Sequence, residues 1–300
     1  MSTPNRASKI TKMHKVLKKH YKPYVVADRP LLEHLLYACC LQAATHEAAD
    51  EAFAKLQQAY YDWNEVRVTT ISELAEVMNC LPQPAETASR LKRTLQSVFE
   101  AYYSFDLDGL KKDNIGKAVK QLERLNGITD FTLAFVVQNG LGGHAIAVSD
   151  GAFEVLRVLG IVSDDEVAKR RVPGLERAIP KSKGAEFGAL LHQAGADYVA
   201  APFSSRVRAV LLEIAPDAKQ RFPKRVGKKG TDETAPAAAP PEKDADKPRE
   251  DADKKDEPKK PPRKKAASKL ESGKNKKKQL PETSNPKKSP TKKLSKRKPR

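Results

Sequence analysis

The stretch LNGITDFTLAFVVQNGLGGHAIAVSDGAFEVL, residues 125 to 156, decides the fold that this sequence predicts. It contains a turn with a glycine, an apolar helix, a Gly-Gly break, and a polar pair before a second apolar helix. An earlier apolar helix ends at Leu125, and the next one restarts near Thr129. The pattern therefore predicts a helix-hairpin-helix.

The turn between these two helices suits one phosphate of a nucleic acid. A hairpin of this kind directs free backbone N–H groups and a helix N-terminus outward, which can hold a phosphate without reading base sequence. An Asn-Gly turn also serves any plain αα-hairpin, so the turn alone does not separate the two interpretations. On the first interpretation, the residues that contact DNA are Asn126, Gly127, Ile128 and Thr129.

Helical periodicity extends from about residue 7 to residue 222. Apolar residues recur at three- and four-residue spacing in segments such as LLEHLLYACCLQAA and PAETASRLKRTLQSVFEAYY. Helix-start signals agree, since Thr70 with Glu73 forms a capping-box pattern and Asp113 or Asn114 can cap a helix. Because neither βαβ alternation nor a tandem repeat of fixed period occurs, the sequence predicts an all-α fold.

The C-terminal part differs in composition from the rest of the chain. Residues 226–300 hold 25 Lys or Arg against 12 Asp or Glu, and 11 of the 21 prolines, but no Phe, Trp or Tyr. Such a segment buries too little apolar surface to offset chain entropy, which predicts disorder. We therefore expect a basic N-terminal segment over residues 1–20, a helical domain over 21–225, and a disordered Lys/Pro-rich tail over 226–300.

The end of this tail favours a polyanionic partner. Residues 258–300 carry 18 basic against 2 acidic side chains, and clusters of this density bind polyanions through counterion release. A solubilising tail and a membrane-surface contact are the alternatives, although no amphipathic helix with aromatic anchors supports the membrane. The tail residues that we expect to contact DNA are Lys264, Lys265, Lys276, Lys277 and Lys278.

Composition also bounds the setting of this chain of 300 residues and net charge +18. No apolar stretch approaches the length of a membrane span, and the basic N-terminus leads into no signal-type apolar core. Cys39, Cys40 and Cys80 lack metal-ligand spacing, which indicates free thiols in a reducing compartment. We expect a monomer that is cytoplasmic and nucleoid-associated, or nuclear in a eukaryote.

The order of these segments resembles the endonuclease III branch of the helix-hairpin-helix DNA glycosylase superfamily over roughly residues 15 to 222. LLYACCLQAAT is similar to an early family helix that ends in a Gln-Ala-Thr segment, and LNGIT stands where the family has its LPGVG hairpin. HAIAVSDGAFEVLRVLGIV resembles the segment that begins with the family's catalytic aspartate. EFGALLHQAGADYV resembles the helix that leads to its iron–sulfur loop.

The resemblance implies a defined chemistry in active members. They flip a damaged base out of the duplex, and the aspartate stabilises the positive charge that develops on the sugar as the glycosidic bond breaks. Bifunctional members add a lysine after the hairpin, which forms a Schiff base with the sugar. In this chain Phe131 stands at the lysine position, so the resemblance implies no lyase step.

The aspartate position is equivocal. The alignment with the family places Ser149 at the aspartate position and Asp150 one residue later. A serine supplies no negative charge, and a carboxylate displaced by one helical residue points about 100° away around the helix axis. Serine and aspartate are also preferred helix caps, so the same residues are compatible with a capped helix that has no catalytic role.

Further site residues follow from the resemblance. Gln42 matches the glutamine that fills the gap left by a flipped base, although a polar residue at a helix end is the alternative. His144 can face DNA or close a turn, and His192 is expected to be a hydrogen-bonded histidine. The family's iron–sulfur cluster needs four thiolate ligands, but no cysteine follows Cys80, so we predict neither a cofactor nor a bound metal.

These observations predict an all-α helix-hairpin-helix glycosylase-like domain with a disordered lysine-rich C-terminal tail. We expect a catalytically degenerate relative of the base-excision-repair glycosylases that binds double-stranded DNA largely through backbone phosphates. A monofunctional DNA glycosylase that uses Asp150 is the first alternative. A protein-interaction scaffold with a polybasic tail is the second.

Overall fold

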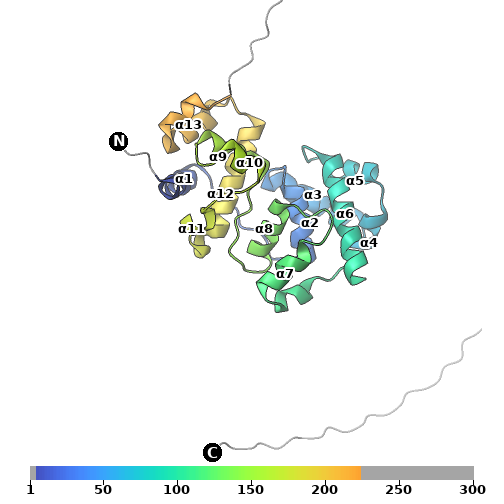
Figure 1. Ribbon diagram of the computed structural model, residues 1–300. Helices are drawn as coiled ribbons and strands as arrows, with labels where there is room; N and C mark the ends of the chain where they lie inside the picture. The colour runs from blue at the N-terminus through green and yellow to red at the C-terminus, as the bar shows by residue number, and fades with distance from the viewer. Residues whose placement is uncertain (1–4, 224–300) are drawn as a thin grey trace, which may run out of the picture. The chain divides into compact units, whose positions relative to one another are not determined.

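Helices joined by loops make up residues 5–223, the part that this computed structural model describes, and no strand occurs within that range (Figure 1). The all-α prediction is therefore confirmed, whereas the predicted disorder of the tail falls outside the described residues. In chain order the elements are α1 (Arg6–His20), α2 (Leu31–Leu41), α3 (His46–Ala59), α4 (Trp63–Val68), α5 (Ile71–Val77), α6 (Pro84–Tyr102), the 3₁₀-helix η1 (Asp108–Lys112), α7 (Ile115–Leu122), α8 (Asp130–Asn139), α9 (Asp150–Val158), α10 (Asp164–Ala168), α11 (Leu175–Ala178), α12 (Lys181–Ala200), α13 (Ser205–Ile214) and the 3₁₀-helix η2 (Pro216–Gln220).

Two clusters of buried apolar side chains hold these helices together. The first core lies within residues 31–147 and joins α2 through α8. The second core joins α1 with α9 through α13, and Figure 1 shows the blue α1 on the side of α11, α12 and α13. The hairpin of α7 and α8 belongs to the first core, and the chain passes to the second core between α8 and α9.

The helix α1 is an integral part of the second core. Ile10, Met13 and Leu17 recur at three- and four-residue spacing and are fully buried, whereas Lys12 and Lys15 face outward. These apolar residues pack α1 on α11, α12 and α13. A domain boundary at residue 20 would separate α1 from the helices on which it packs. Residues 6–20 therefore belong to the same folded unit as those helices.

A close backbone contact sets the position of α9. A Cβ atom on Gly151 would lie 2.4 Å from the carbonyl oxygen of Gly195 in α12, and one on Gly195 would lie 2.4 Å from the amide nitrogen of Ala152. Because real Cβ atoms do not approach backbone so closely, only glycine fits at these two positions. The contact presses the first turn of α9 against α12.

Local capping fixes several helix starts. The predicted capping box of Thr70 and Glu73 is present at α5, and the side chain of Asn114 caps α7 by accepting the N–H of Gly116 at 2.9 Å. Both caps satisfy N–H groups that have no partner inside a helix. Within residues 5–223, no helix is long and apolar enough to cross a membrane.

Candidate functional site

The predicted hairpin forms between α7 and α8. The first helix ends at Leu122, slightly earlier than the sequence predicts, and the chain turns through Gly127 with a φ of +91°. Glycine adopts this left-handed conformation without strain. A Cβ on Gly127 would lie 2.6 Å from Thr94 Oγ1 of α6, and the N–H of Asn126 donates to Ser97 Oγ at 3.0 Å. The turn therefore rests on α6.

The turn leaves backbone donors available. Among the described residues, no acceptor contacts the N–H groups of Gly127 and Ile128. Thr129 has a φ of −109°, so it carries no left-handed strain although the family has a glycine there, and its hydroxyl caps α8. The exposed carboxylate of Asp130 begins α8 and opposes an anion at that helix end.

Gln42 contacts the hairpin directly. Its side chain is buried at the end of α2, and Thr129 Oγ1 donates to Gln42 Oε1 at 2.8 Å. Both residues are candidates for DNA contact in the sequence, and the structure brings them together across 87 positions of the chain. The bond ties the end of α2 to the start of α8, so Gln42 positions the hairpin in this structure.

Phe131 stands where the resemblance to the family expects a lysine. Its ring is 1% exposed and packs against the rings of Phe135 and His192, with centroid distances of 6.3 and 5.6 Å. A phenyl ring neither attacks carbon nor accepts a proton. The first turn of α8 therefore contributes apolar packing, and no nucleophile, at this position.

Ser149 and Asp150 start α9 in different roles. Ser149 is buried, and its Oγ accepts the N–H of Ala152 at 3.4 Å, so it is the N-cap that the sequence allows. Asp150 is the first residue of the helix, and its side chain is 65% exposed. The carboxylate of Asp150 pairs with the guanidinium of Arg170 at 2.5 Å, which balances its negative charge.

Arg170 is a site residue that the sequence analysis does not identify. It follows the end of α10 with a φ of +50°, a backbone conformation that residues other than glycine rarely adopt. The motif KRR at residues 169–171 is a visible sequence signal, but its pairing with Asp150 depends on how the chain folds. A strongly basic triplet near the end of a short helix is the only local hint.

Two buried imidazoles lie beside this site. His192 of α12 is 4% exposed, and its Nε2 forms a 2.8 Å hydrogen bond with the carbonyl oxygen of Ala44, in agreement with the predicted hydrogen-bonded histidine. Burial lowers the pKa of His192 to about 4. Burial, together with the neighbouring His192 ring, lowers the pKa of His46 to about 3. Both rings are therefore neutral at pH 7.

Acid is expected to destabilise the fold through these two rings. Their folded pKa values lie below the ordinary value of 6.5, so the unfolded chain binds more protons as the pH falls from 6.5 towards 4. The free energy of unfolding should then drop by up to ~1.4 kcal/mol per pH unit for each imidazole. Urea denaturation across this pH window measures the drop, and His192→Gln should reduce it. An unchanged pH slope in that variant would contradict this assignment.

His144 serves the turn before α9. His144 lies in the loop between α8 and α9, and its Nε2 forms a 2.8 Å hydrogen bond with the carbonyl oxygen of Glu176 in α11. The structure therefore shows His144 joining this loop to α11. Its predicted contact with DNA stays a prediction.

A pocket of about 360 Å³ opens between α2, α9 and α12. Gln42, Ser149, Asp150 and His192 all line it, so four residues singled out from distant parts of the sequence meet here. The remaining walls are mostly small residues from the start of α9, the end of α12 and the segment 43–45 after α2, with Pro82 and Gln83 before α6. Neither a lysine nor an unpaired buried carboxylate lies among the lining residues.

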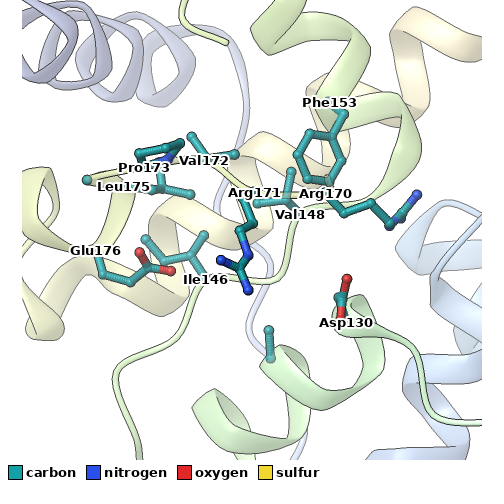
Figure 2. A pocket seen from close by; sticks show the side chains of 12 residues that line it. Asp130, Ile146, Val148, Phe153, Arg170, Arg171, Val172, Pro173, Leu175 and Glu176 are labelled. Atoms are coloured by element: carbon teal, nitrogen blue, oxygen red, sulfur yellow. The ribbon is translucent and has the colours of Figure 1, made fainter. Parts of the chain in front are cut away.

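A second, more open hollow of about 470 Å³ lies on the other side of α9. Figure 2 shows Arg171 projecting into it between Glu176 and Asp130, while Phe153 and Arg170 stand at one end. Asp130 comes from the hairpin helix α8 and Arg170 from the loop after α10. The loop that carries the two arginines therefore adjoins the hairpin.

The region after α12 is where the resemblance expects the iron–sulfur loop. The described residues after α12 contain no cysteine, and no group of three or more His, Cys, Asp or Glu within residues 5–223 could hold a metal ion. Arg208 of α13 instead lies 5.3 Å from the ring of Phe203 and 4.9 Å from that of Phe222. It also donates to the carbonyl oxygens of Pro202 and Pro223, at 3.4 and 3.3 Å. Arg208 therefore links the segment before α13 to the segment after η2.

The predicted site residues thus fall into separate groups. Gln42, Ser149 and Asp150 share the pocket, and Thr129 joins them through its bond to Gln42. The turn at Asn126–Ile128 rests on α6, and His144 contacts α11. The tail lysines, from Lys264 to Lys278, lie outside the described residues.

Comparisons with known proteins bear on the fold. The sequence matches no protein-family model and no curated protein. A trapped endonuclease III–DNA covalent intermediate, an estranged-adenine complex, is 17% identical with a TM-score of 0.50, over 74% of this chain and 100% of that chain. A non-covalent endonuclease III–DNA complex is 18% identical with a TM-score of 0.51, over 73% and 99%. A thermostable thymine-DNA glycosylase is 16% identical with a TM-score of 0.51, over 72% and 97%.

These likenesses extend over nearly the whole of each matched structure and over the described helices of this chain. They agree with the fold that the order of motifs in the sequence predicts. The described part of this chain therefore has the helix-hairpin-helix DNA glycosylase fold, the fold of endonuclease III.

Proposed function

We propose that this protein binds double-stranded DNA, largely through backbone phosphates, as a catalytically degenerate relative of the DNA glycosylases. The single observation that carries the proposal is the state of the two reactive positions. A buried Phe131 occupies the lysine position, and a capping Ser149 occupies the aspartate position. Neither group supplies a nucleophile or a negative charge to the pocket.

Several features of the described residues support DNA as the partner. The hairpin keeps two N–H groups without an acceptor at Gly127 and Ile128, which suits one phosphate. The pocket of about 360 Å³ lies within the size range of small-molecule sites, and its lining residue Gln42 is hydrogen-bonded to Thr129 of the hairpin. The endonuclease III structures with the same fold are complexes with DNA.

The pocket further suggests a role in sensing. A base flipped from the duplex meets apolar walls, the amide of Gln42 and the hydroxyl of Ser149 in this pocket. Stacking and hydrogen bonding of this kind recognise a base without breaking its glycosidic bond. The protein would then retain a damaged or distorted duplex and leave it intact.

A monofunctional glycosylase that uses Asp150 is the second candidate. The observation that favours it is the place of Asp150 among the residues that line the pocket, next to Ser149. The ion pair with Arg170 works against it, because a cation at 2.5 Å offsets the charge that would stabilise an oxocarbenium-like sugar. On this alternative the enzyme is an N-glycosylase without lyase activity.

We expect the protein to bind duplexes that contain oxidised pyrimidines, alkylated purines, uracil or mismatches, and to release no base from them. Strand scission after alkali treatment measures base release, and fluorescence anisotropy measures binding. Borohydride should trap no covalent adduct, because Phe131 replaces the lysine that forms the Schiff base. An adduct would show that another lysine has taken the role, and peptide mapping would locate it.

Asp150→Asn separates the two candidates. If the wild type releases a base and the variant loses on the order of 10² or more in rate while still binding DNA, the glycosylase alternative holds. If neither protein releases a base and both bind, the degenerate relative holds, because Ser149, which caps α9, is unchanged in the variant. Absence of DNA binding would exclude both and favour a protein-interaction scaffold.

A further inference from the structure

Arg170 occupies a backbone position that glycine normally fills. The N–H of Arg170 donates to the carbonyl oxygen of Val167 and that of Arg171 to Glu166, both at 2.9 Å, which closes the C-terminal end of α10. In such a helix ending, the residue in the left-handed conformation is usually glycine, because a side chain is strained there. Arg170 has a φ of +50°. A strained backbone conformation at a residue other than glycine suggests that its side chain has a function.

The side chain of Arg170 is held from two directions by α9. Its Nη1 donates to Asp150 Oδ1 at 2.5 Å, and its guanidinium lies 5.4 Å from the ring centroid of Phe153. Asp150 and Phe153 are three residues apart on one helix, so they present a carboxylate and a ring face to the same guanidinium. The charged head of Arg170 is thereby fixed beside the start of α9.

Most hydrogen-bond donors of this guanidinium are unused. An arginine side chain carries five N–H donors, and among the described residues only Asp150 accepts from Arg170. The side chain is 36% exposed, and its neighbours Lys169 and Arg171 are exposed as well. A fixed fork of donors, flanked by two further cations, is therefore available to an anion from solution.

The location places this fork between the hairpin and the pocket. Asp150 lines the pocket at the start of α9, and Arg170 stands at the end of the hollow that Asp130 of α8 also borders (Figure 2). The carboxylate of Asp130 repels an anion at the N-terminus of α8. Arg170 offers a positive charge close by, on the side of the hollow where α8 begins.

We propose that Arg170 binds a phosphodiester of DNA at this rim, with Asp150 and Phe153 as its positioning residues. The proposal rests on the proposed binding of DNA and names a residue that the hairpin and the tail do not include. A guanidinium fork matches the geometry of two phosphate oxygens, and one that is already ordered loses little freedom on binding. The left-handed strain is retained because glycine cannot make this contact.

Arg170→Gly in the full-length chain tests the proposal. Anisotropy of a labelled duplex should show about tenfold weaker binding, and the slope of log K against log salt should flatten by about 0.9, the loss of one phosphate contact. Glycine suits the left-handed position, so the melting temperature should stay within about 4 °C of the wild type. Arg170→Lys should keep the salt slope but weaken binding severalfold, because it lacks the fork.

Lys169→Ala is the matched control, since it removes a neighbouring exposed charge that has no ion-pair partner among the described residues. It should weaken binding much less than Arg170→Gly. An equal loss of DNA affinity in the two variants would mean that Arg170 acts only as one of several surface charges, and would overturn the proposal. So would a Gly variant with the affinity and salt slope of the wild type. If the wild type itself fails to bind DNA, the proposed function fails first and this contact with it.

Discussion

Removal of residues 226–300 is expected to weaken binding to duplex DNA by on the order of 10² or more at low salt. Residues 258–300 carry a net charge of +16, against +5 for residues 1–225, so the tail should supply most of the non-specific affinity. Each phosphate that is neutralised contributes about −0.9 to the slope of log K against log salt, and five contacts give roughly −4 to −5. The truncated protein should bind in the micromolar range or more weakly, with a markedly flatter slope.

A titration of labelled duplex at several salt concentrations measures both quantities. The matched control deletes residues 226–257, which removes 10 acidic side chains and keeps the basic residues 258–300. This control should retain the steep slope of the full chain. If loss of the whole tail changes neither affinity nor slope, the tail only aids solubility, and the folded domain binds DNA by another surface.

Gly195→Ala is expected to lower the free energy of unfolding by about 3 kcal/mol. The new Cβ would lie 2.4 Å from the amide nitrogen of Ala152 and 2.7 Å from the carbonyl carbon of Gly151, both backbone atoms of α9 that no rotamer change can move. The helices α9 and α12 must therefore separate. For a domain of this size the melting temperature should fall by roughly 6–12 °C.

Thermal unfolding followed by circular dichroism gives this number directly. Gly109→Ala is the control, because no heavy atom lies within 4 Å of a Cβ built there, and its effect should stay within about 0.5 kcal/mol. A Gly195→Ala protein as stable as the wild type would mean that α9 and α12 do not touch. The start of α9, and with it Asp150, would then be placed differently.

The helices and the hairpin could be predicted because their signals are local. The spacing of apolar residues, the Asn-Gly turn and the Thr70–Glu73 cap each act within a few residues of the chain. The resemblance to the glycosylase family singled out Phe131 and Ser149, and the structure shows the first as buried packing and the second as a cap. These parts of the prediction needed no knowledge of distant contacts.

The remaining parts depend on residues that are far apart in sequence. The bond from Thr129 to Gln42 spans 87 positions, and no local pattern announces it. Arg170 becomes visible only when its backbone angle and its pairing with Asp150 are known. The lysines of α1 predict a separate basic segment, but Ile10 and Met13 at helical spacing form an apolar face that packs on the second core.

The packing of α1 also orders events while the chain is being synthesised. The first core lies in one continuous stretch, residues 31–147, so it can close before α9 through α13 have been translated. The apolar face of α1 must wait, because its partners begin more than a hundred residues later, at Ile146. Domains generally fold as units while translation proceeds from the N-terminus. Although α1 precedes both α2 and the rest of the first core in the chain, we therefore expect it to pack after that core has formed.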